Sequence, residues 1–231
     1  MKDSGIESRF KEFPQSALVW KLPTFVEDPL DLEDQTRKVK SFPYVILDLR
    51  GNRGGRVDSL DHFLGRFFAR DVMAGEFKDR KHSAPVRIKG HQSPAADAKL
   101  IVLIDSKSAS AVEIFARIIQ LEKRGIVLGD RSSGMVMESE RVVHAVQVTP
   151  VNVTQYGATI TIADLIMSDG KRLEGVGVDP DERVVPTPQD LQAGRDPVLA
   201  RALAIAGAQI DAQQAGALFP FEWPPLPPAM N

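Results

Sequence analysis

The stretch YVILDLRGNRGG (44–55) decides the fold. Its first part, YVILDLR (44–50), is apolar almost throughout, which is typical of a central strand covered on both faces of a sheet. Its second part, GNRGG (51–55), is a turn that needs the backbone freedom of glycine. A helix is expected around Asp58–Phe68, so the stretch predicts a strand, a tight turn and a helix in succession.

The same pattern returns further along the chain. KLIVLID (99–105) predicts a second buried strand, and DSKSASAVEIFARIIQ (105–120) continues through a serine-rich turn into a helix expected over Ala111–Lys123. GIVLG (125–129) predicts a third strand. Strands that alternate with helices in this way imply crossover connections, so we expect an α/β fold with a mainly parallel sheet.

The flanking segments complete the expected organisation. Before the central strands we expect a strand in SALVWKLPTF (16–25) and a helix over 28–40. A charged loop that contains proline is expected before residue 99, with KDRKH (78–82) exposed to solvent. From residue 141 onward we expect a β-rich C-terminal part, followed by a last helix over 197–207. We therefore expect a polar N-terminal segment (1–15), a core domain (16–207) and a proline-rich tail (208–231). The end of that tail, FPFEWPPLPPAMN, is expected to be extended.

Composition excludes several classes of function. The 231 residues carry 29 Lys and Arg against 31 Asp and Glu, a net charge of −2, so no basic face for nucleic acid or an anionic membrane is indicated. The absence of cysteine excludes disulfides, thiolate catalysis and thiolate metal sites. No apolar run reaches membrane-spanning length, and the start MKDSGIESRFKEF has no signal-peptide core. We expect no metal and no cofactor, and the compartment stays undetermined.

The serine cluster allows two interpretations. Ser110 and Glu113 fit the S-x-x-E capping box, in which both side chains satisfy free amides at a helix start. The same place suits a nucleophile, because a helix N-terminus offers free amides and a favourable dipole to a developing oxyanion. Ala111, a small residue, would leave its amide accessible. The serine cluster directly follows a buried strand, and this position favours the catalytic interpretation but does not exclude the capping one.

The glycine turn adds a second set of amides. Two strand–turn–helix corners in one parallel sheet bring backbone N–H groups close together, and such pairs form oxyanion holes. GNRGG has neither the GxGxxG spacing of a dinucleotide fold nor the GxxxxGK[ST] pattern of a phosphate loop. Nucleotide binding is therefore disfavoured.

Four segments in order carry a family resemblance: VILDLRGNRGG, LIVLIDSKSASAVEIFARIIQ, RGIVLGDRSSG and LEGVGVDPD. Together they resemble the tail-specific, C-terminal-processing serine peptidases. The resemblance implies a core related to the crotonase and Clp-protease superfold. It also implies that Ser110 is the nucleophile, and that the amides of Ala111 and Gly54 form the oxyanion hole.

The chain departs from the Ser–Lys branch of that family. The position that matches the family's lysine is Met135, which cannot accept a proton, and the position of a family glutamine is Ser139. The Ser–Lys mechanism is therefore unsupported. Three other lysines that could be considered as a base are expected on the surface: Lys107, Lys123 and Lys171.

A tricorn-like branch uses serine and histidine with a supporting glutamate, and Glu174 in LEGVGVDPD fits that glutamate. The four histidines, His62, His82, His91 and His144, match no family histidine by motif, and His144 is the least implausible substitute. Since serine needs a base, three explanations stay open. The base lies in a missing upstream region, which we favour; a partner subunit supplies it; or the chain is non-catalytic.

The leading hypothesis is a serine endopeptidase core that cleaves extended or unfolded polypeptides by acyl transfer. Its partners would be a polypeptide substrate and either a further copy of the chain or a partner region that supplies the base. The first alternative is a non-catalytic module that binds peptides. A second is a crotonase-like enzyme acting on an acyl-coenzyme A, since that superfold also pairs backbone amides around a thioester oxygen.

Overall fold

The computed structural model describes residues 7–26, 29–149 and 152–220. Its main sheet has the strand order β1-β2-β3-β6-β7-β10. These strands are β1 (Arg9–Phe13), β2 (Ala17–Lys21), β3 (Tyr44–Asp48), β6 (Lys99–Ile104), β7 (Gly125–Gly129) and β10 (Glu182–Arg183). Only β1 pairs antiparallel, with β2, and every other pairing in the sheet is parallel. The expected α/β class with a mainly parallel sheet is confirmed.

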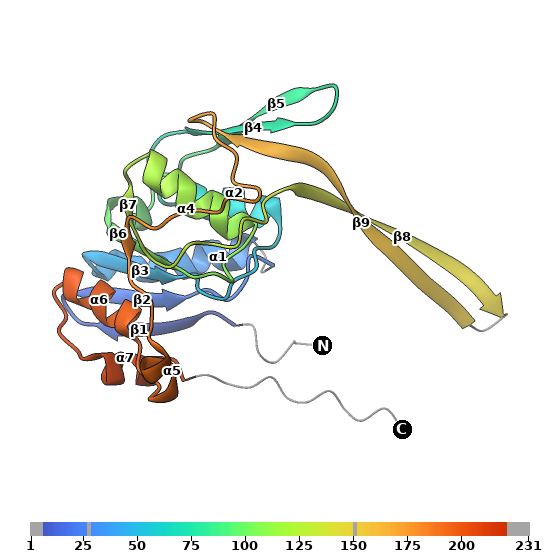
Figure 1. Cartoon of the computed structure of the whole chain (residues 1–231). Coiled ribbons are helices and arrows are strands. Elements are labelled where there is room, and N and C mark those ends of the chain that lie inside the picture. Colours follow the sequence, from blue (N-terminus) through green and yellow to red (C-terminus); the bar gives the residue numbers. More distant parts are fainter. Residues whose placement is uncertain (1–6, 27–28, 150–151, 221–231) are drawn as a thin grey trace.

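Helices cover both faces of the main sheet (Figure 1). In β3 the side chains alternate between two cores: Val45 and Leu47 belong to one, and Ile46 to the other. The first core includes apolar residues of α2 (Val57–Gly65) and α4 (Ala111–Leu121), and the second those of α6 (Pro197–Ile205) and α7 (Ala212–Leu218). Burial on both faces is why the centre of this strand, Val45–Leu47, is apolar.

A second, antiparallel sheet has the order β5-β4-β9-β8. Its strands are β4 (Val72–Lys78), β5 (Ser83–Ile88), β8 (Glu138–Thr149) and β9 (Asn152–Met167). The expected β-rich part is therefore present, and β8 and β9 extend from the body as a long two-stranded arm (Figure 1). The expectation of a loop before residue 99 is wrong where β4 and β5 form a hairpin. The turn of that hairpin, Asp79–His82, is exposed, so the expectation that KDRKH (78–82) is solvated is confirmed.

The remaining elements are α1 (Pro29–Thr36), a 3-10 helix (Arg37–Ser41), α3 (Pro94–Asp97) and α5 (Pro188–Gln192). The segment 1–15 contains β1, so the sheet begins before the expected core. The segment 208–231 contains α7, whose Ala215 is buried in the second core. The stretch FPFEWPPLPPAMN lies outside the described residues from 221 on. Among the described helices, none combines the length and apolarity needed to cross a bilayer.

The distal arm is expected to add little to folding stability. Val143, Val153, Tyr156 and Ile160 are each about half-exposed or more, at 49%, 60%, 59% and 50%. Replacing residues 142–158 with an Asn-Gly turn should therefore shift the thermal unfolding midpoint by no more than about 2 °C. Calorimetry checks this, and a larger drop would show that the arm is stabilised by contacts with the body.

Candidate active site

The glycine turn after β3 and the serine turn after β6 lie against each other. A Cβ placed on Gly54 would come within 2.8 Å of the Ser110 Cβ and 2.9 Å of the Ala111 nitrogen. Gly54 also has φ of +89°, a conformation that favours glycine. Glycine is therefore required at residue 54 both for its conformation and for the close approach of Ser110.

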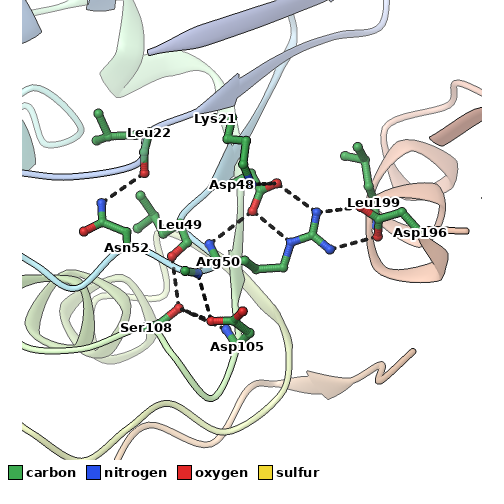
Figure 2. Close-up of polar contacts among 11 residues, drawn as sticks. Lys21, Leu22, Asp48, Leu49, Arg50, Asn52, Asp105, Ser108, Asp196 and Leu199 are labelled. Atoms are coloured by element: carbon green, nitrogen blue, oxygen red, sulfur yellow. Dashed lines mark hydrogen bonds and ion pairs between the residues drawn. The ribbon is translucent and has the colours of Figure 1, made fainter. Parts of the chain in front are cut away.

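Side-chain hydrogen bonds join these two turns. The Asp105 Oδ1 accepts from the Gly51 N–H at 2.9 Å and from the Ser108 hydroxyl at 3.2 Å. The one proton of the Ser108 hydroxyl is shared between this oxygen and the Leu49 carbonyl, which lies at 3.0 Å, and Figure 2 shows the hydroxyl between the two strand ends. The Ala109 N–H donates to the Asn52 carbonyl at 3.1 Å. Ser108 is thus fully occupied in holding the turns together.

A buried ion network fixes the end of β3 to the start of α6. Arg50 donates to both carboxylate oxygens of Asp48 at 2.8 Å and to those of Asp196 at 2.8 and 2.7 Å (Figure 2). Lys21 adds a bond to Asp48 at 3.1 Å. Burial alone would raise the pKa of Asp48, but the charges of Arg50 and Lys21 and the Arg50 hydrogen bonds outweigh it and hold that pKa far below its ordinary value.

Ser110 starts α4 with an unusual backbone conformation. Its φ is 57° and its ψ is −121°. A non-glycine residue held in such a conformation costs of order 1–3 kcal/mol and is typical of functional sites. Ser110 is half-buried and Ala111, the first helical residue, is buried. The Ser110 side chain therefore lies at the N-terminus of α4.

Glu113 accepts four hydrogen bonds at a fully buried position. The donors are the Ser110 N–H at 2.9 Å, the Ser132 hydroxyl at 2.6 Å, the Gly134 N–H at 2.7 Å and the Met135 N–H at 2.9 Å. The carboxylate thus ties the amide of Ser110 to the segment that follows β7. Its role extends well beyond the capping expected from the S-x-x-E spacing.

A cavity of about 140 Å³ opens beside Ser110. Ser110, Ala111, Gly55 and Ser139 are among the residues that line it. Gly54 is not, and its N–H donates to the buried Asn52 Oδ1 at 2.7 Å. The cavity is therefore bordered by both turns, with Gly55 as the glycine exposed to it.

Glu174 is linked to this cavity by hydrogen bonds from the backbone of two residues that line it. Its Oε2 accepts from the Val136 N–H at 2.7 Å and from the Met137 N–H at 3.2 Å, and both of these residues line the cavity. The two bonds share one oxygen. The carboxylate therefore anchors the chain at the cavity wall and carries a second oxygen, Oε1.

The candidate bases lie elsewhere. No histidine or lysine lines the cavity. His144 stacks on Tyr156 in the arm, His82 is in the β4–β5 turn, and His62 lies beside His91. Lys107, Lys123 and Lys171 are exposed. Met135, which the resemblance matches to the lysine of the Ser–Lys branch, is 65% exposed. Over the described residues, no group of three or more histidines, aspartates or glutamates could hold a metal ion.

One carboxyl in α2 makes stability depend on pH. Burial, helped by the charge of Asp58, raises the pKa of Asp61 from 3.8 to about 6. A raised folded-state pKa means that stability is present below pH 4 and is lost as pH rises through 6. Asp61→Asn should therefore stabilise the protein by about 1 kcal/mol at pH 8, allowing for partial exposure, and not at pH 3.5. Urea unfolding at both pH values checks this, and an equal effect at both would contradict it.

Several residues that shape this region were not expected from the sequence. Asn52, Ser132 and Asp196 act through partners far away in the chain. Glu113 was visible in the S-x-x-E spacing, but its bonds to residues 132–135 were not. The sequence feature that could have indicated these bonds is the place of Glu113 in the first turn of an apolar helix. A carboxylate that is buried there needs hydrogen-bond donors.

The sequence matches the family model for Peptidase family S41 over residues 17–184. The carboxy-terminal-processing protease of Bartonella bacilliformis is 30% identical over 148 residues, which is 63% of this chain and 31% of that protein. The tail-specific protease of Haemophilus influenzae is 32% identical over 143 residues, 58% of this chain and 20% of that protein. The chain thus spans less than a third of either relative.

Solved structures support the same fold. A putative peptidase from Parabacteroides merdae superposes with a TM-score of 0.70 at 21% identity, covering 87% of this chain and 64% of that one. The tricorn protease superposes with a TM-score of 0.58 at 19% identity, covering 83% of this chain and 18% of that one. The match of the family model spans most of the chain and includes both turns of the cavity. The chain belongs to peptidase family S41.

Proposed function

We propose that this chain is the core of a serine-type peptidase that hydrolyses peptide bonds in extended or unfolded polypeptides by acyl transfer. The observation that carries the proposal is Ser110, which has a strained backbone and lies on the wall of a cavity at the start of α4. Membership of family S41 favours this reading over an acyl-coenzyme A enzyme.

In the proposed reaction the Ser110 Oγ attacks the scissile carbonyl carbon and its proton passes to a base. The oxyanion accepts hydrogen bonds from the Ala111 N–H and from a glycine N–H of the turn after β3. Because Asn52 already occupies the Gly54 N–H, we assign the second bond to Gly55. The intermediate collapses to an acyl-enzyme as the amine leaves with a proton, and water then releases the acyl group.

The base is proposed to come from outside the residues that line the cavity, either from a further region of a longer protein or from a partner subunit. Glu174 would orient it through Oε1, since Oε2 is occupied by the Val136 and Met137 amides. A histidine so oriented would complete a serine–histidine–glutamate arrangement.

Covalent labelling tests the proposal. A fluorophosphonate probe should modify Ser110 in the protein together with its partner region, as located by peptide mass spectrometry. Ser110→Ala should abolish this labelling, whereas Ser106→Ala, at an exposed serine of the same turn, should leave it unchanged. Labelling that survives Ser110→Ala would exclude Ser110 as the nucleophile.

Met135 favours a second candidate function, that of a non-catalytic relative that binds peptides. It replaces the family's lysine at a position that is 65% exposed. This candidate predicts measurable peptide affinity with no cleavage of an unfolded protein. Cleavage that depends on Ser110 would exclude it.

A further inference from the structure

The arm formed by β8 and β9 exposes apolar side chains on the face that carries a histidine. Opposite residues of an antiparallel pair share one face, as do alternate residues of one strand. The register pairs His144 with Tyr156, and Val146 and Ile160 are an even number of residues away in the same two strands. Tyr156, Ile160 and Val146 therefore lie on the face of His144, and they are 59%, 50% and 45% exposed. We call these four residues the Tyr156 face.

The outer part of the arm has no further strand beside it. In the described residues, β9 pairs with β4 only over Asp164–Met167, and β8 pairs only with β9. Beyond that point the arm is a ribbon of two strands (Figure 1). A two-stranded ribbon is only marginally stable in water unless a further strand or element packs against it. A partner that covers the Tyr156 face would therefore stabilise the arm.

His144 is held in place by its neighbour across the ribbon. Its ring stacks on that of Tyr156, with the ring centroids 5.6 Å apart and the planes at 28°. The side chain is exposed, and within the part of the chain that the structure describes its ring makes no hydrogen bond. Both ring nitrogens of His144 are therefore available to a group outside this chain.

His144 does not reach Ser110 of its own chain. Ser139 lines the cavity beside Ser110, and His144 follows five residues later in the same strand. At about 3.3 Å per residue the two positions are roughly 17 Å apart along the strand. The arm also extends away from the body (Figure 1). Any Ser110 that His144 serves must therefore belong to another copy.

The rim of the cavity offers contacts that the Tyr156 face lacks. Val57 lines the cavity and is 42% exposed, and Met135, directly before the cavity-lining Val136, is 65% exposed. Glu138 lines the same cavity, so a histidine that gains a proton there would meet a negative charge. The rim thus has apolar side chains for the Tyr156 face and an acidic one for the imidazolium.

We infer that two copies of this chain exchange arms about a twofold axis, and that His144 of one copy is the general base for Ser110 of the other. This rests on the proposed function and assigns the base that it requires. A twofold axis makes the exchange reciprocal, so two arms cover two cavities and each Ser110 receives one histidine. The Tyr156 face then packs on the rim of the second copy, which supplies the cover that the ribbon lacks.

The proton balance is that of a serine–histidine mechanism. His144 accepts the Ser110 hydroxyl proton as the bond from Oγ to the carbonyl carbon forms, and donates it to the amine nitrogen as the C–N bond breaks. It next accepts a proton from the water that attacks the acyl group, and returns that proton to the Ser110 Oγ as the acid leaves. Glu174 of the chain that holds the cavity would orient the imidazole through Oε1.

The oligomeric state tests the exchange of arms. The wild type should sediment as a dimer, and Ile160→Asp should weaken the dimer about tenfold or more, because a carboxylate would be buried at the interface. Val153→Asp, at a residue 60% exposed on the opposite face, should change the dissociation constant by less than about twofold. A monomeric wild type, or equal effects of the two variants, would overturn the inference.

This dimer is compatible with the small thermal effect expected when residues 142–158 are replaced. At a protein concentration equal to the dissociation constant, association adds only about 0.4 kcal/mol to stability.

Complementation between two inactive variants tests the assignment of the base. His144→Ala keeps the nucleophile without the base, and Ser110→Ala keeps the base without the nucleophile, so neither alone should react with the fluorophosphonate at residue 110. An equimolar mixture forms heterodimers with one complete site each, so labelling of Ser110 should return to about a quarter of the wild-type level. His82→Ala, at a histidine 79% exposed in the β4–β5 turn, should be labelled like the wild type.

The outcomes separate this inference from the proposed function. A labelled wild type whose variants fail to complement each other, or a His144→Ala protein labelled like the wild type, would overturn the inference alone. So would a wild-type chain that is labelled at Ser110 only when joined to a further region of a longer protein. Absence of Ser110 labelling in every one of these forms would contradict both.

Discussion

Arg50→Ala is expected to lower the free energy of unfolding by about 3–5 kcal/mol, because it leaves a buried carboxylate without its main partner. Asp48 is fully buried, and Arg50 makes bidentate bonds to it. The same guanidinium bridges to Asp196, which caps α6 by accepting from the Leu199 N–H. Denaturant unfolding at pH 7 measures the loss.

An exposed pair provides the control. Arg131 binds Asp179 in the same bidentate manner, but the two side chains are 59% and 67% exposed. Arg131→Ala should therefore cost no more than about 0.5 kcal/mol. Similar losses for Arg50→Ala and Arg131→Ala would show that burial of the first network has no energetic consequence.

The Arg50 network also predicts a pH dependence. The pKa of Asp48 is held well below its ordinary 3.8, so the stabilisation is present above pH 4 and is lost as pH falls further. The difference in stability between wild type and Arg50→Ala should therefore shrink below pH 4. A difference that grows in acid would contradict the assignment of Asp48 as the ionised partner.

Glu113→Ala is the second substitution with a large expected effect. It removes the acceptor of four donors, three of them backbone amides, and each unsatisfied buried donor costs about 1–3 kcal/mol. We expect the free energy of unfolding to fall by at least about 3 kcal/mol. Fluorophosphonate labelling at Ser110 should also be lost, because the Ser110 N–H would no longer be held by Glu113. Denaturant unfolding and labelling of the remaining folded protein measure the two effects.

Glu113→Gln should not retain the stability of the wild type or its labelling at Ser110. Each Glu113 oxygen accepts two hydrogen bonds, so an amide NH₂ in place of either oxygen would face two donors. Glu182→Ala serves as the control, since Glu182 and its partner Arg201 are 39% and 49% exposed and should contribute within about 0.5 kcal/mol. A stable, labelled Glu113→Gln protein would show that the carboxylate does not position Ser110.

The central strands of the main sheet and the helix α4 could be predicted because their apolar patterns are local, whereas β1 and β10 at its edges were not. YVILD, KLIVLI and GIVLG are β3, β6 and β7, and the helix expected from Ala111 is α4. The hairpin of β4 and β5 could not be predicted, since β4 contains Gly75, β5 contains Pro85, and β4 is stabilised by pairing with β9. The helix α7, AQQAGAL, has a weak pattern and depends on packing against α6.

The candidate site was predictable as far as motif order allowed. The sequence indicated Ser110, Ala111 and the glycine turn, which the structure brings together. It could not indicate that Asn52 occupies the Gly54 amide, because that depends on a side-chain rotamer within the turn. Nor could it indicate that Arg50 also binds Asp196, which lies 146 residues away in the chain.

A crystal structure with a peptidyl boronic acid is the most direct test of the proposed oxyanion hole. We predict a covalent bond from boron to the Ser110 Oγ, with one boronate oxygen about 2.7–3.1 Å from the Ala111 and Gly55 nitrogens. Boron bound to another residue, or a boronate oxygen turned away from both amides into solvent, would contradict the assignment.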